Sequence, residues 1–326
     1  MKVAFFDAKP YDKPSFERYG AEVGLRFKFY ETKLTEDTVA LARGCVGICI
    51  FVNDEVTPSI IDRLVEEGCR FIALRCAGYN NVDLAYLGDK MPVFHVPAYS
   101  PHSVAEHAMA MLLTSIRRIH KAYIRTRDFN FSLNGMTGFD LHGKTVGVVG
   151  TGKIGRCFID ICRGFGMRVL AYDKYPADLD GVEYVDTDTL FRESDIISLH
   201  CPLTKETYHM IDDTAIRQMK LRAIIINTSR GALIDAEDLL MAIKERRIGG
   251  ACLDVYEEES DLFFEDFSNH IVADDILTRL ISMPNVIVTS HQAFLTEEAL
   301  DSIAETTVEN ITNYLTDSTL QNQVNK

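Results

Sequence analysis

The stretch Val146–Gly155 reads VGVVGTGKIG, and it decides the fold. Its β-branched residues predict a strand, and the apolar residues that follow Gly155 at helical spacing predict a helix immediately after the turn. Gly150, Gly152 and Gly155 have the GxGxxG spacing of a dinucleotide-binding turn. The first glycine allows a tight turn, the second lets the backbone approach a pyrophosphate, and the third lets the helix pack closely on the strand. The positive end of the helix dipole then favours the phosphates.

A second β-like run, residues 168–173, ends in an acid, Asp173. A carboxylate at this position can accept hydrogen bonds from the adenosine ribose hydroxyls, and it repels a 2′-phosphate. We therefore expect NAD rather than NADP, although the neighbouring Lys174 weakens this preference slightly. The alternative is a glycine-rich turn without a ligand, which the strand, the helix and the acid together disfavour.

Composition and charge narrow the class of protein. The chain has 326 residues, 47% hydrophobic and 25% charged, which suggests a globular protein of about two domains. Its net charge of −14 argues against a nucleic-acid surface. The short basic run at residues 116–121 is typical of a solvated helix face. No stretch approaches the roughly 18 continuous apolar residues of a membrane span, so we expect no membrane partner.

Cysteine usage indicates the compartment. The eight cysteines form no CxxC pair, and most lie in apolar runs, where a free thiol behaves as a small buried hydrophobe. The N-terminus lacks the apolar region and cleavage site of a signal peptide. We therefore expect a reducing, cytoplasmic location, and we expect no metal site.

The first 99 residues alternate β-like runs with helical patterns. This alternation predicts a parallel sheet with right-handed crossovers, a smaller flavodoxin-like α/β domain without a dinucleotide fingerprint. The expected strands are residues 2–6, 26–30, 46–51, 70–74 and 93–96, and the expected helices include 14–20, 36–43 and 58–67.

A long helix is expected to carry the chain into a second domain. Ser100 and Pro101 form a helix-start signal, and apolar residues at helical spacing continue through Tyr123. The sheet that follows should be parallel and doubly wound, because its strands are near-continuous apolar runs. Besides the two runs already described, the expected strands are residues 183–185, 195–200, 223–227, 250–255 and 285–289.

The amphipathic pattern over residues 297–315 predicts a last helix that returns to the first domain. The expected division is therefore a substrate domain of residues 1–99 plus 297–326 and an NAD-binding domain of residues 100–296, with a cleft between them. The tail, residues 316–326, is expected to be weakly ordered.

Three residues with ionisable side chains, which can bind a carboxylate or transfer a proton, follow strands of the second domain. Arg230 follows residues 223–227, Glu259 follows 250–255 and His291 follows 285–289. Ligands bind at the carboxyl ends of parallel strands, so we expect the three side chains at one sheet edge.

Each of the three has a role in oxidising a 2-hydroxy acid. Arg230 can grip a carboxylate in a bidentate way, and His291 can exchange the hydroxyl proton near neutral pH. Glu259 can orient that imidazole and favour its protonated form. The alternatives are structural: an Arg paired with a carboxylate, a Glu among several solvated acids, and a His without a catalytic role.

Several longer motifs carry a resemblance to a known family. GTGKIG, NTSRGALID, ACLDVYEEES and TSHQAF resemble the D-isomer-specific 2-hydroxyacid dehydrogenases over almost the whole chain. LRCAGYNNVDL, VPAYSPHSVAEHA, SLHCPLT, DLFFEDFSN and SHQAFLT resemble the fermentative D-lactate dehydrogenases within that family.

The resemblance implies a role for further residues. It implies that Arg230 binds the substrate carboxylate, that His291 is the acid/base and that Glu259 is its partner, with Glu257 and Glu258 as competitors for that last role. It also implies that the backbone N–H groups of Ala77 and Gly78, after Cys76, hold the carboxylate and that Tyr99 and Phe294 line the pocket. The implied cofactor contacts are Gly150, Gly152, Lys153, Ile154, Gly155, Asp173, Cys201, Pro202, Thr228 and Asp254.

The implied activity is reduction of pyruvate to D-lactate with NADH by a homodimer or homotetramer. Tyr79 and Ser290 depart from the residues common in the subgroup, and Tyr79 puts the substrate range in doubt. One alternative is a dehydrogenase for bulkier 2-keto acids, such as those that give 2-hydroxyisocaproate or phenyllactate. Others are an NAD(H)-sensing binding protein of the same fold and a phosphoglycerate-type enzyme, which would want further basic residues and a regulatory domain.

Overall fold

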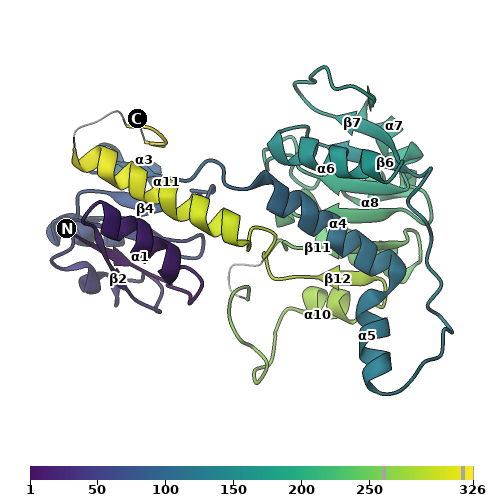
Figure 1. The fold of residues 1–326 in the computed structure, drawn as a ribbon, viewed down its shortest axis with the longest axis horizontal. Coiled ribbons are helices and arrows are strands. Elements are labelled where there is room, and N and C mark those ends of the chain that lie inside the picture. The colour runs from purple at the N-terminus through teal and green to yellow at the C-terminus, as the bar shows by residue number, and fades with distance from the viewer. Residues whose placement is uncertain (259–261, 317–319, 326) are drawn as a thin grey trace. The chain divides into compact units, whose positions relative to one another are not determined.

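The computed structural model describes residues 1–258, 262–316 and 320–325. The chain divides into two compact units, the first formed by Met1–Ser100 with Leu295–Lys326 and the second by Pro101–Phe294 (Figure 1). No helix among the described residues is long and apolar enough to cross a bilayer.

The first unit is an α/β layer built on a five-stranded parallel sheet. Its strand order, β2-β1-β3-β4-β5, is the flavodoxin-like order and confirms the expected architecture. The strands are β1 (Lys2–Phe5), β2 (Arg26–Phe29), β3 (Gly47–Ile50), β4 (Ile72–Leu74) and β5 (Val93–Phe94). The helices are α1 (Lys13–Glu22), η1 (Val39–Ala42, a 3₁₀ turn), α2 (Pro58–Glu66), α3 (Leu84–Leu87) and α11 (Glu297–Leu315).

The C-terminal helix belongs to this first unit. Helix α11 packs beside α1, the first helix of the chain, as Figure 1 shows. At its end, the ring of Tyr314 lies 5.9 Å from that of Phe71 and 5.7 Å from that of Phe94, measured between centroids. Aromatic packing at the end of β4 and β5 therefore fixes the last turn of the helix.

The second unit is a doubly wound sheet of seven parallel strands, as expected. Its order, β12-β11-β10-β9-β6-β7-β8, places the first strand, β6, beside the point where the order reverses. The strands are β6 (Thr145–Val149), β7 (Arg168–Tyr172), β8 (Val182–Tyr184), β9 (Ile196–Leu199), β10 (Ile224–Asn227), β11 (Gly250–Leu253) and β12 (Val286–Val288). The helices are α4 (Pro101–Arg117), α5 (Ile119–Arg127), α6 (Lys153–Gly164), α7 (Thr187–Glu193), α8 (Asp213–Gln218), η2 (Gly231–Leu233, 3₁₀), α9 (Ala236–Lys244) and α10 (Asp275–Ser282).

Two apolar layers cover the two faces of this sheet. Val146 and Val148 of β6 face a core formed with α4 and α6, whereas Val149 faces a core formed with α7 to α10. Successive side chains of a strand point to opposite faces, so both sides of the central strands are buried. This explains why these strands are near-continuous apolar runs in the sequence.

Two expected helices differ from the structure. The helix expected over residues 36–43 is only the short 3₁₀ turn η1, because Thr38 Oγ1 bonds to the carbonyl of Lys33 and accepts from the N–H of Thr35, which competes with helical pairing. The helix expected to run from Pro101 through Tyr123 breaks at Arg118, whose φ of 53° is left-handed. None of the residues of α5 beyond the break is buried.

The tail is the third difference. Among its described residues, Gln323 pairs antiparallel with Phe94 of β5, and the N–H of Val324 donates to the carbonyl of Val93 at 3.0 Å. The side chain of Asn325 adds bonds to the N–H of Val93 and the carbonyl of Gly88. Residues 320–325 are therefore attached to the sheet edge rather than weakly ordered.

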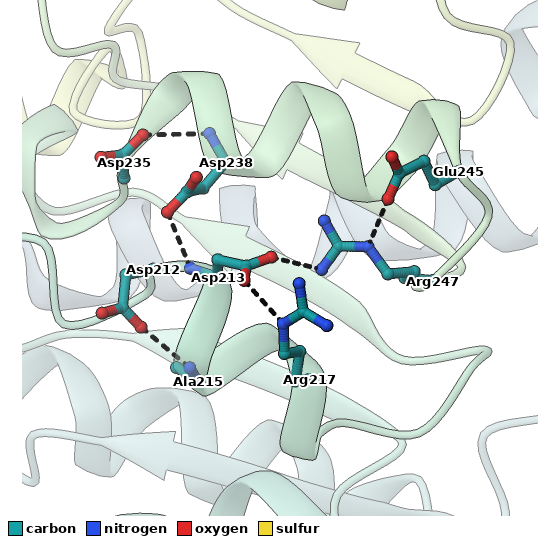
Figure 2. Close-up of polar contacts among 8 residues, drawn as sticks. All are labelled: Asp212, Asp213, Ala215, Arg217, Asp235, Asp238, Glu245 and Arg247. Atoms are coloured by element: carbon teal, nitrogen blue, oxygen red, sulfur yellow. Dashed lines mark hydrogen bonds and ion pairs between the residues drawn. The ribbon is translucent and has the colours of Figure 1, made fainter.

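Acidic caps fix two helices of the second unit (Figure 2). Asp212 caps α8 through the N–H of Ala215, and Asp235 caps α9 through the N–H of Asp238. Asp238 also accepts from the N–H of Asp213, which joins the starts of the two helices. This junction holds the segment before α9, which includes the turn η2 that follows Arg230.

Candidate active site

The glycine-rich turn between β6 and α6 has two packed glycines and one that faces open space. Gly150 has a φ of 95°, and a Cβ there would lie 2.7 Å from backbone atoms of His200 and Cys201. A Cβ on Gly155 would overlap the carbonyl oxygen of Gly150. Around Gly152, apart from its chain neighbours, no described heavy atom would lie within 4 Å of an added Cβ. The turn therefore leaves room at Gly152 alone.

The start of α6 offers unpaired N–H groups beside this space. Gly152 is the N-cap residue, and no side chain caps the helix. Lys153 and Ile154 are its first two residues, and Arg156 Nε donates to the carbonyl of Thr151 at 2.9 Å, which holds the turn. A positive helix end with free N–H groups and an open cradle fits a pyrophosphate.

Asp173, directly after β7, faces the same turn. Its Oδ2 accepts from Thr151 N at 2.6 Å and Thr151 Oγ1 at 2.9 Å, and its Oδ1 accepts from Tyr175 N at 2.8 Å. Partial burial raises the pKa of the Asp173 carboxyl, but these hydrogen bonds outweigh burial and hold the pKa below its ordinary value. The group is therefore anionic at neutral pH, and its remaining lone pairs can receive ribose hydroxyls.

The ends of β9 and β10 carry three more candidates. Cys201 and Pro202 follow β9, and burial raises the pKa of the Cys201 thiol to about 11, so the thiol stays protonated. Thr228 follows β10, and its buried Oγ1 has no hydrogen-bond partner among the described residues. Ser229 Oγ donates to the carbonyl of Cys201 at 2.7 Å, which joins the two strand ends. The open cradle, the uncapped helix, the acid and this hydroxyl together fit a dinucleotide.

Arg230 presents its charge without a structural carboxylate. Its Nη1 donates to the carbonyl of Ser229 at 2.8 Å, and no ion pair of Arg230 occurs among the residues that the structure describes. Asn227, the fully buried last residue of β10, braces the turn: its Oδ1 accepts from Ser229 N and its Nδ2 donates to the carbonyl of Arg230. A half-buried guanidinium of this kind can bind a substrate carboxylate.

Close packing brings the Arg230 turn against the end of the neighbouring strand β11. A Cβ on Gly231 would overlap the carbonyl of Tyr256 and the backbone N of Glu257. The turn after β10 therefore lies directly on the backbone that follows β11, and only glycine permits this approach.

His291 lies three residues after β12 in a strained backbone conformation. Its φ is 51°, in the left-handed region that non-glycine residues rarely adopt. Its backbone N–H donates to the carbonyl of Asp254 at 2.7 Å, and its half-buried ring lies 5.9 Å from that of Phe264 between centroids. Strain of this kind persists only where the surroundings enforce it.

The carboxylate of Asp254 is the main part of those surroundings. It is completely buried, and it accepts from Thr289 Oγ1 at 2.5 Å, Gln292 N at 2.9 Å and Ala293 N at 2.8 Å, with His107 Nε2 at 3.3 Å. Burial raises the pKa of Asp254, but these partners outweigh burial and lower it. Asp254 thus holds the turn that carries His291, and its contact with the cofactor stays a prediction.

Glu259 lies outside the described residues, so its partnership with His291 also stays a prediction. Of its two competitors, Glu257 binds His209, with Oε1 and Nε2 2.6 Å apart, and Glu258 is exposed. His209 also lies 3.3 Å from Asp235. Sequence reasoning missed these contacts of His209, because a single His in a loop carries no motif that singles it out.

The loop after β4 carries the candidates of the first unit. The backbone N–H groups of Ala77 and Gly78 have no protein acceptor among the described residues. The carbonyl of Cys76 accepts from Val96 N at 3.0 Å, and that of Ala77 bonds to His95 Nδ1 at 2.9 Å. The loop thus has its carbonyls bonded and two adjacent donors available for an anion.

The two aromatic candidates lie at the ends of their units. Tyr99 is half-buried near the end of the first segment of unit one, and Phe294, the last residue of unit two, is 7% exposed. Sequence reasoning missed two histidines of the candidate site. His107 bonds to Asp254, and His95 bonds to the carbonyl of Ala77. His107 lies within the motif VPAYSPHSVAEHA but was given no role there, and His95 lies outside every motif.

The chain is similar in sequence to known proteins. Residues 109–293 match the sequence model described as the NAD-binding domain of D-isomer-specific 2-hydroxyacid dehydrogenases. The chain is 52% identical to the D-lactate dehydrogenase of Escherichia coli (strain K12), over 99% of this chain and 100% of that protein.

Solved structures agree as well. The apo-structure of D-lactate dehydrogenase from Escherichia coli matches with a TM-score of 0.92 and 48% identity over 99% of this chain and 100% of that one. The NAD-complexed D-isomer-specific 2-hydroxyacid dehydrogenase from Lactobacillus delbrueckii ssp. bulgaricus matches with a TM-score of 0.85 and 29% identity over the full length of both chains.

Proposed function

Since the chain belongs to the D-isomer-specific 2-hydroxyacid dehydrogenase family and contains its NAD-binding domain, we propose that it is a D-lactate dehydrogenase that reduces pyruvate with NADH. The observation that carries this proposal is the 52% identity to a D-lactate dehydrogenase over 99% of the chain. The second unit is the NAD-binding domain, and the first would be the substrate domain.

The residues that would hold NADH surround the glycine-rich turn. The N-terminus of α6 and the space at Gly152 would take the pyrophosphate, Asp173 the adenosine ribose, and Thr228 Oγ1 a polar group of the cofactor. When bound, NADH supplies the hydride that reduces the keto carbon.

The remaining chemistry belongs to three side chains. Arg230 would bind the substrate carboxylate and polarise the carbonyl, and its lack of an ion pair among the described residues supports this role. An imidazole N–H of His291 would donate the proton to the keto oxygen. Glu259 would favour the protonated imidazole that this direction requires. The N–H groups of Ala77 and Gly78 would bind the same carboxylate.

The test is the oxidation of NADH with a series of 2-keto acids. We expect the highest specificity constant for pyruvate. A higher constant for phenylpyruvate would keep the mechanism and contradict the lactate assignment, which is the outcome that Tyr79 leaves open. Binding of NADH without turnover of any keto acid would contradict the enzyme and favour a sensor. The chain contains no Trp, so NADH fluorescence reports binding with little background.

The catalytic role of His291 has its own test. Exchange of His291 for Ala should reduce kcat by about 10²- to 10⁴-fold, the usual contribution of a general acid, and should leave the Kd for NADH unchanged. Turnover at the wild-type rate would show that the proton comes from another group.

We also propose that the protein assembles as a homodimer through its second unit. Large apolar side chains after the break at Arg118 are exposed to solvent in the single chain. Ile119 is 54% exposed, Tyr123 60% and Phe129 83%. Apolar surface of this extent on one segment is typical of an interface between subunits. Light scattering should give a dimer or tetramer mass, and Ile119→Lys should lower it; a monomeric wild type would contradict the proposal.

We propose a cytoplasmic location because of the state of the cysteines. All eight lie among the described residues and none forms a disulfide there, as expected in a reducing compartment, and seven are buried. Fractionation of cells that express the protein should recover it in the cytoplasm.

A further inference from the structure

His95 forms the back of the loop at residues 76–78. Its Nδ1 lies 2.9 Å from the carbonyl oxygen of Ala77, and since a carbonyl can only accept, Nδ1 carries the proton. The same ring meets the ring of Tyr79 edge-on, with centroids 5.4 Å apart. Next to it, the N–H of Val96 donates to the carbonyl of Cys76. His95 thus contacts the loop at Ala77 and Tyr79, and its neighbour Val96 contacts it at Cys76.

His95 is itself held by two segments from the other end of the chain. Its backbone N–H donates to the carbonyl of Asn322 in the tail at 3.1 Å, and its carbonyl accepts from Asn310 Nδ2 of α11 at 3.0 Å. Asn322 Nδ2 donates to Asn310 Oδ1 at 3.0 Å, which closes a ring of three hydrogen bonds.

The parts of this ring are well fixed. Asn310 is 3% exposed, so losing its partners would leave buried polar atoms unpaired. Asn322 has a φ of 59°, a conformation that asparagine tolerates better than most residues. The side chain of Asn325 secures the tail further along, through the carbonyls of Gly88 and Met91. The position of the His95 ring is therefore set by the C-terminal tail.

We propose that His95 is a positioning residue for substrate binding, and that the C-terminal tail acts through it. The bond from His95 Nδ1 holds the peptide between Ala77 and Gly78, and the bond from the N–H of Val96 holds the peptide between Cys76 and Ala77. Because the N–H of a trans peptide points away from its carbonyl, both carbonyls face residues 95 and 96, and the N–H groups of Ala77 and Gly78 are presented to the substrate carboxylate. This inference rests on the proposed function, because it requires that these N–H groups bind the carboxylate of a 2-keto acid. In this proposal His95 and the described residues of the tail act without contacting the substrate.

The test compares His95→Phe, which keeps a ring against Tyr79 and removes the donor, with His95→Asn, which keeps an N–H donor near the position of Nδ1. Loss of one hydrogen bond that orients a carboxylate site should raise KM for pyruvate about three- to tenfold. Because the carboxylate is bound equally in the ground and transition states, kcat should change little. The Kd for NADH should stay at the wild-type value, and His95→Asn should restore most of the wild-type KM.

The tail has a separate pair of variants. Asn322→Gly keeps the left-handed backbone and removes the amide, and it should raise KM in the same direction by about two- to fivefold. Gln323→Ala is the matched control, because among the described residues that side chain bonds to Asn325 alone, and it should leave KM unchanged. Inhibition by oxamate, a carboxylate of the same shape as pyruvate, should weaken in parallel with KM.

The outcomes separate the two proposals. Wild-type protein that fails to oxidise NADH with any keto acid contradicts the proposed function. Wild-type turnover with an unchanged KM and an unchanged oxamate Ki in both His95→Phe and Asn322→Gly contradicts the role of His95 and leaves the function standing. A raised KM in Gln323→Ala equal to that in Asn322→Gly would also overturn it, because the effect would then be one of tail stability alone.

Discussion

At the scale of single residues, the proposed site separates side chains that would react from side chains that hold them in place. His291 has the strained backbone, and Asp254 enforces it through the N–H groups of Gln292 and Ala293. Arg230 forms no ion pair with the residues that the structure describes, and the fully buried Asn227 fixes its turn. The holding residues contribute as much to the geometry as the reacting ones, although chemistry alone would not single them out.

Exchange of Asp254 for Asn tests this division. Asparagine offers one acceptor oxygen where the carboxylate offers two, so at least one of the N–H groups after His291 would lose its partner in a buried site. We expect the free energy of unfolding to fall by about 1–3 kcal/mol, as measured with urea, and kcat to fall because His291 is released.

The Kd for NADH distinguishes holding from cofactor contact. An unchanged Kd in Asp254→Asn fits a residue that holds His291. A Kd raised tenfold with unchanged kcat would instead support the direct nicotinamide contact that the family resemblance implies.

His200 predicts how stability depends on pH. Burial lowers its pKa from 6.5 to about 4, and the ring lies 2.9 Å from Ser198 Oγ and 5.0 Å from the ring of Phe158 between centroids. The unfolded chain therefore binds this proton more readily than the folded protein. The contribution to stability is complete above pH 6.5 and is lost as the pH falls toward 4, by about 3 kcal/mol.

Urea unfolding of the cofactor-free protein between pH 7 and pH 4 measures this loss. His200→Gln should unfold with a shallower pH dependence than the wild type over that window. The exposed His102→Gln is the control and should follow the wild type. Identical slopes for His200→Gln and the wild type would contradict the assignment.

At the scale of elements, the glycine turn gives a matched pair of substitutions. Gly152→Ala meets open space at a φ of −67° and should leave stability unchanged, while its Cβ occupies the proposed pyrophosphate position and weakens NADH binding at least tenfold. Gly155→Ala should destabilise the fold, because its Cβ would overlap the carbonyl of Gly150. Calorimetry and NADH titration test both. Equal NADH affinity in Gly152→Ala and wild type would place the pyrophosphate elsewhere.

Elements also show where sequence patterns fail. The apolar spacing runs through Ile119 and Tyr123, yet the helix breaks at Arg118 and these side chains are exposed. Helical periodicity shows that one face of a helix is apolar, but it does not show whether this chain, another subunit or solvent covers that face. The expectation of a weakly ordered tail was wrong because the pattern lacked a signal that the structure has. The tail is attached by hydrogen bonds from the side chains of Asn322 and Asn325, and such bonds leave no apolar pattern in the sequence.

At the scale of the whole molecule, both sheets were predictable because parallel α/β units follow strict rules. Buried β-branched runs, alternation with helices and right-handed crossovers are enough to define two parallel sheets. The sequence also placed Arg230 after β10 and His291 after β12, the two strands that flank β11. It could not supply the contacts of Asp254, His95 or His209, because these depend on pairings between distant segments.

The measurement that tests the central claim most directly is the handedness of the product. The purified protein, with NADH and pyruvate, should oxidise the cofactor and yield lactate, which chiral chromatography then resolves into its two forms. The proposed function predicts D-lactate alone, because Arg230 and His291 would then present one face of the keto group to the hydride. L-lactate or a racemic mixture would contradict both the family assignment of the activity and the arrangement of the site proposed here.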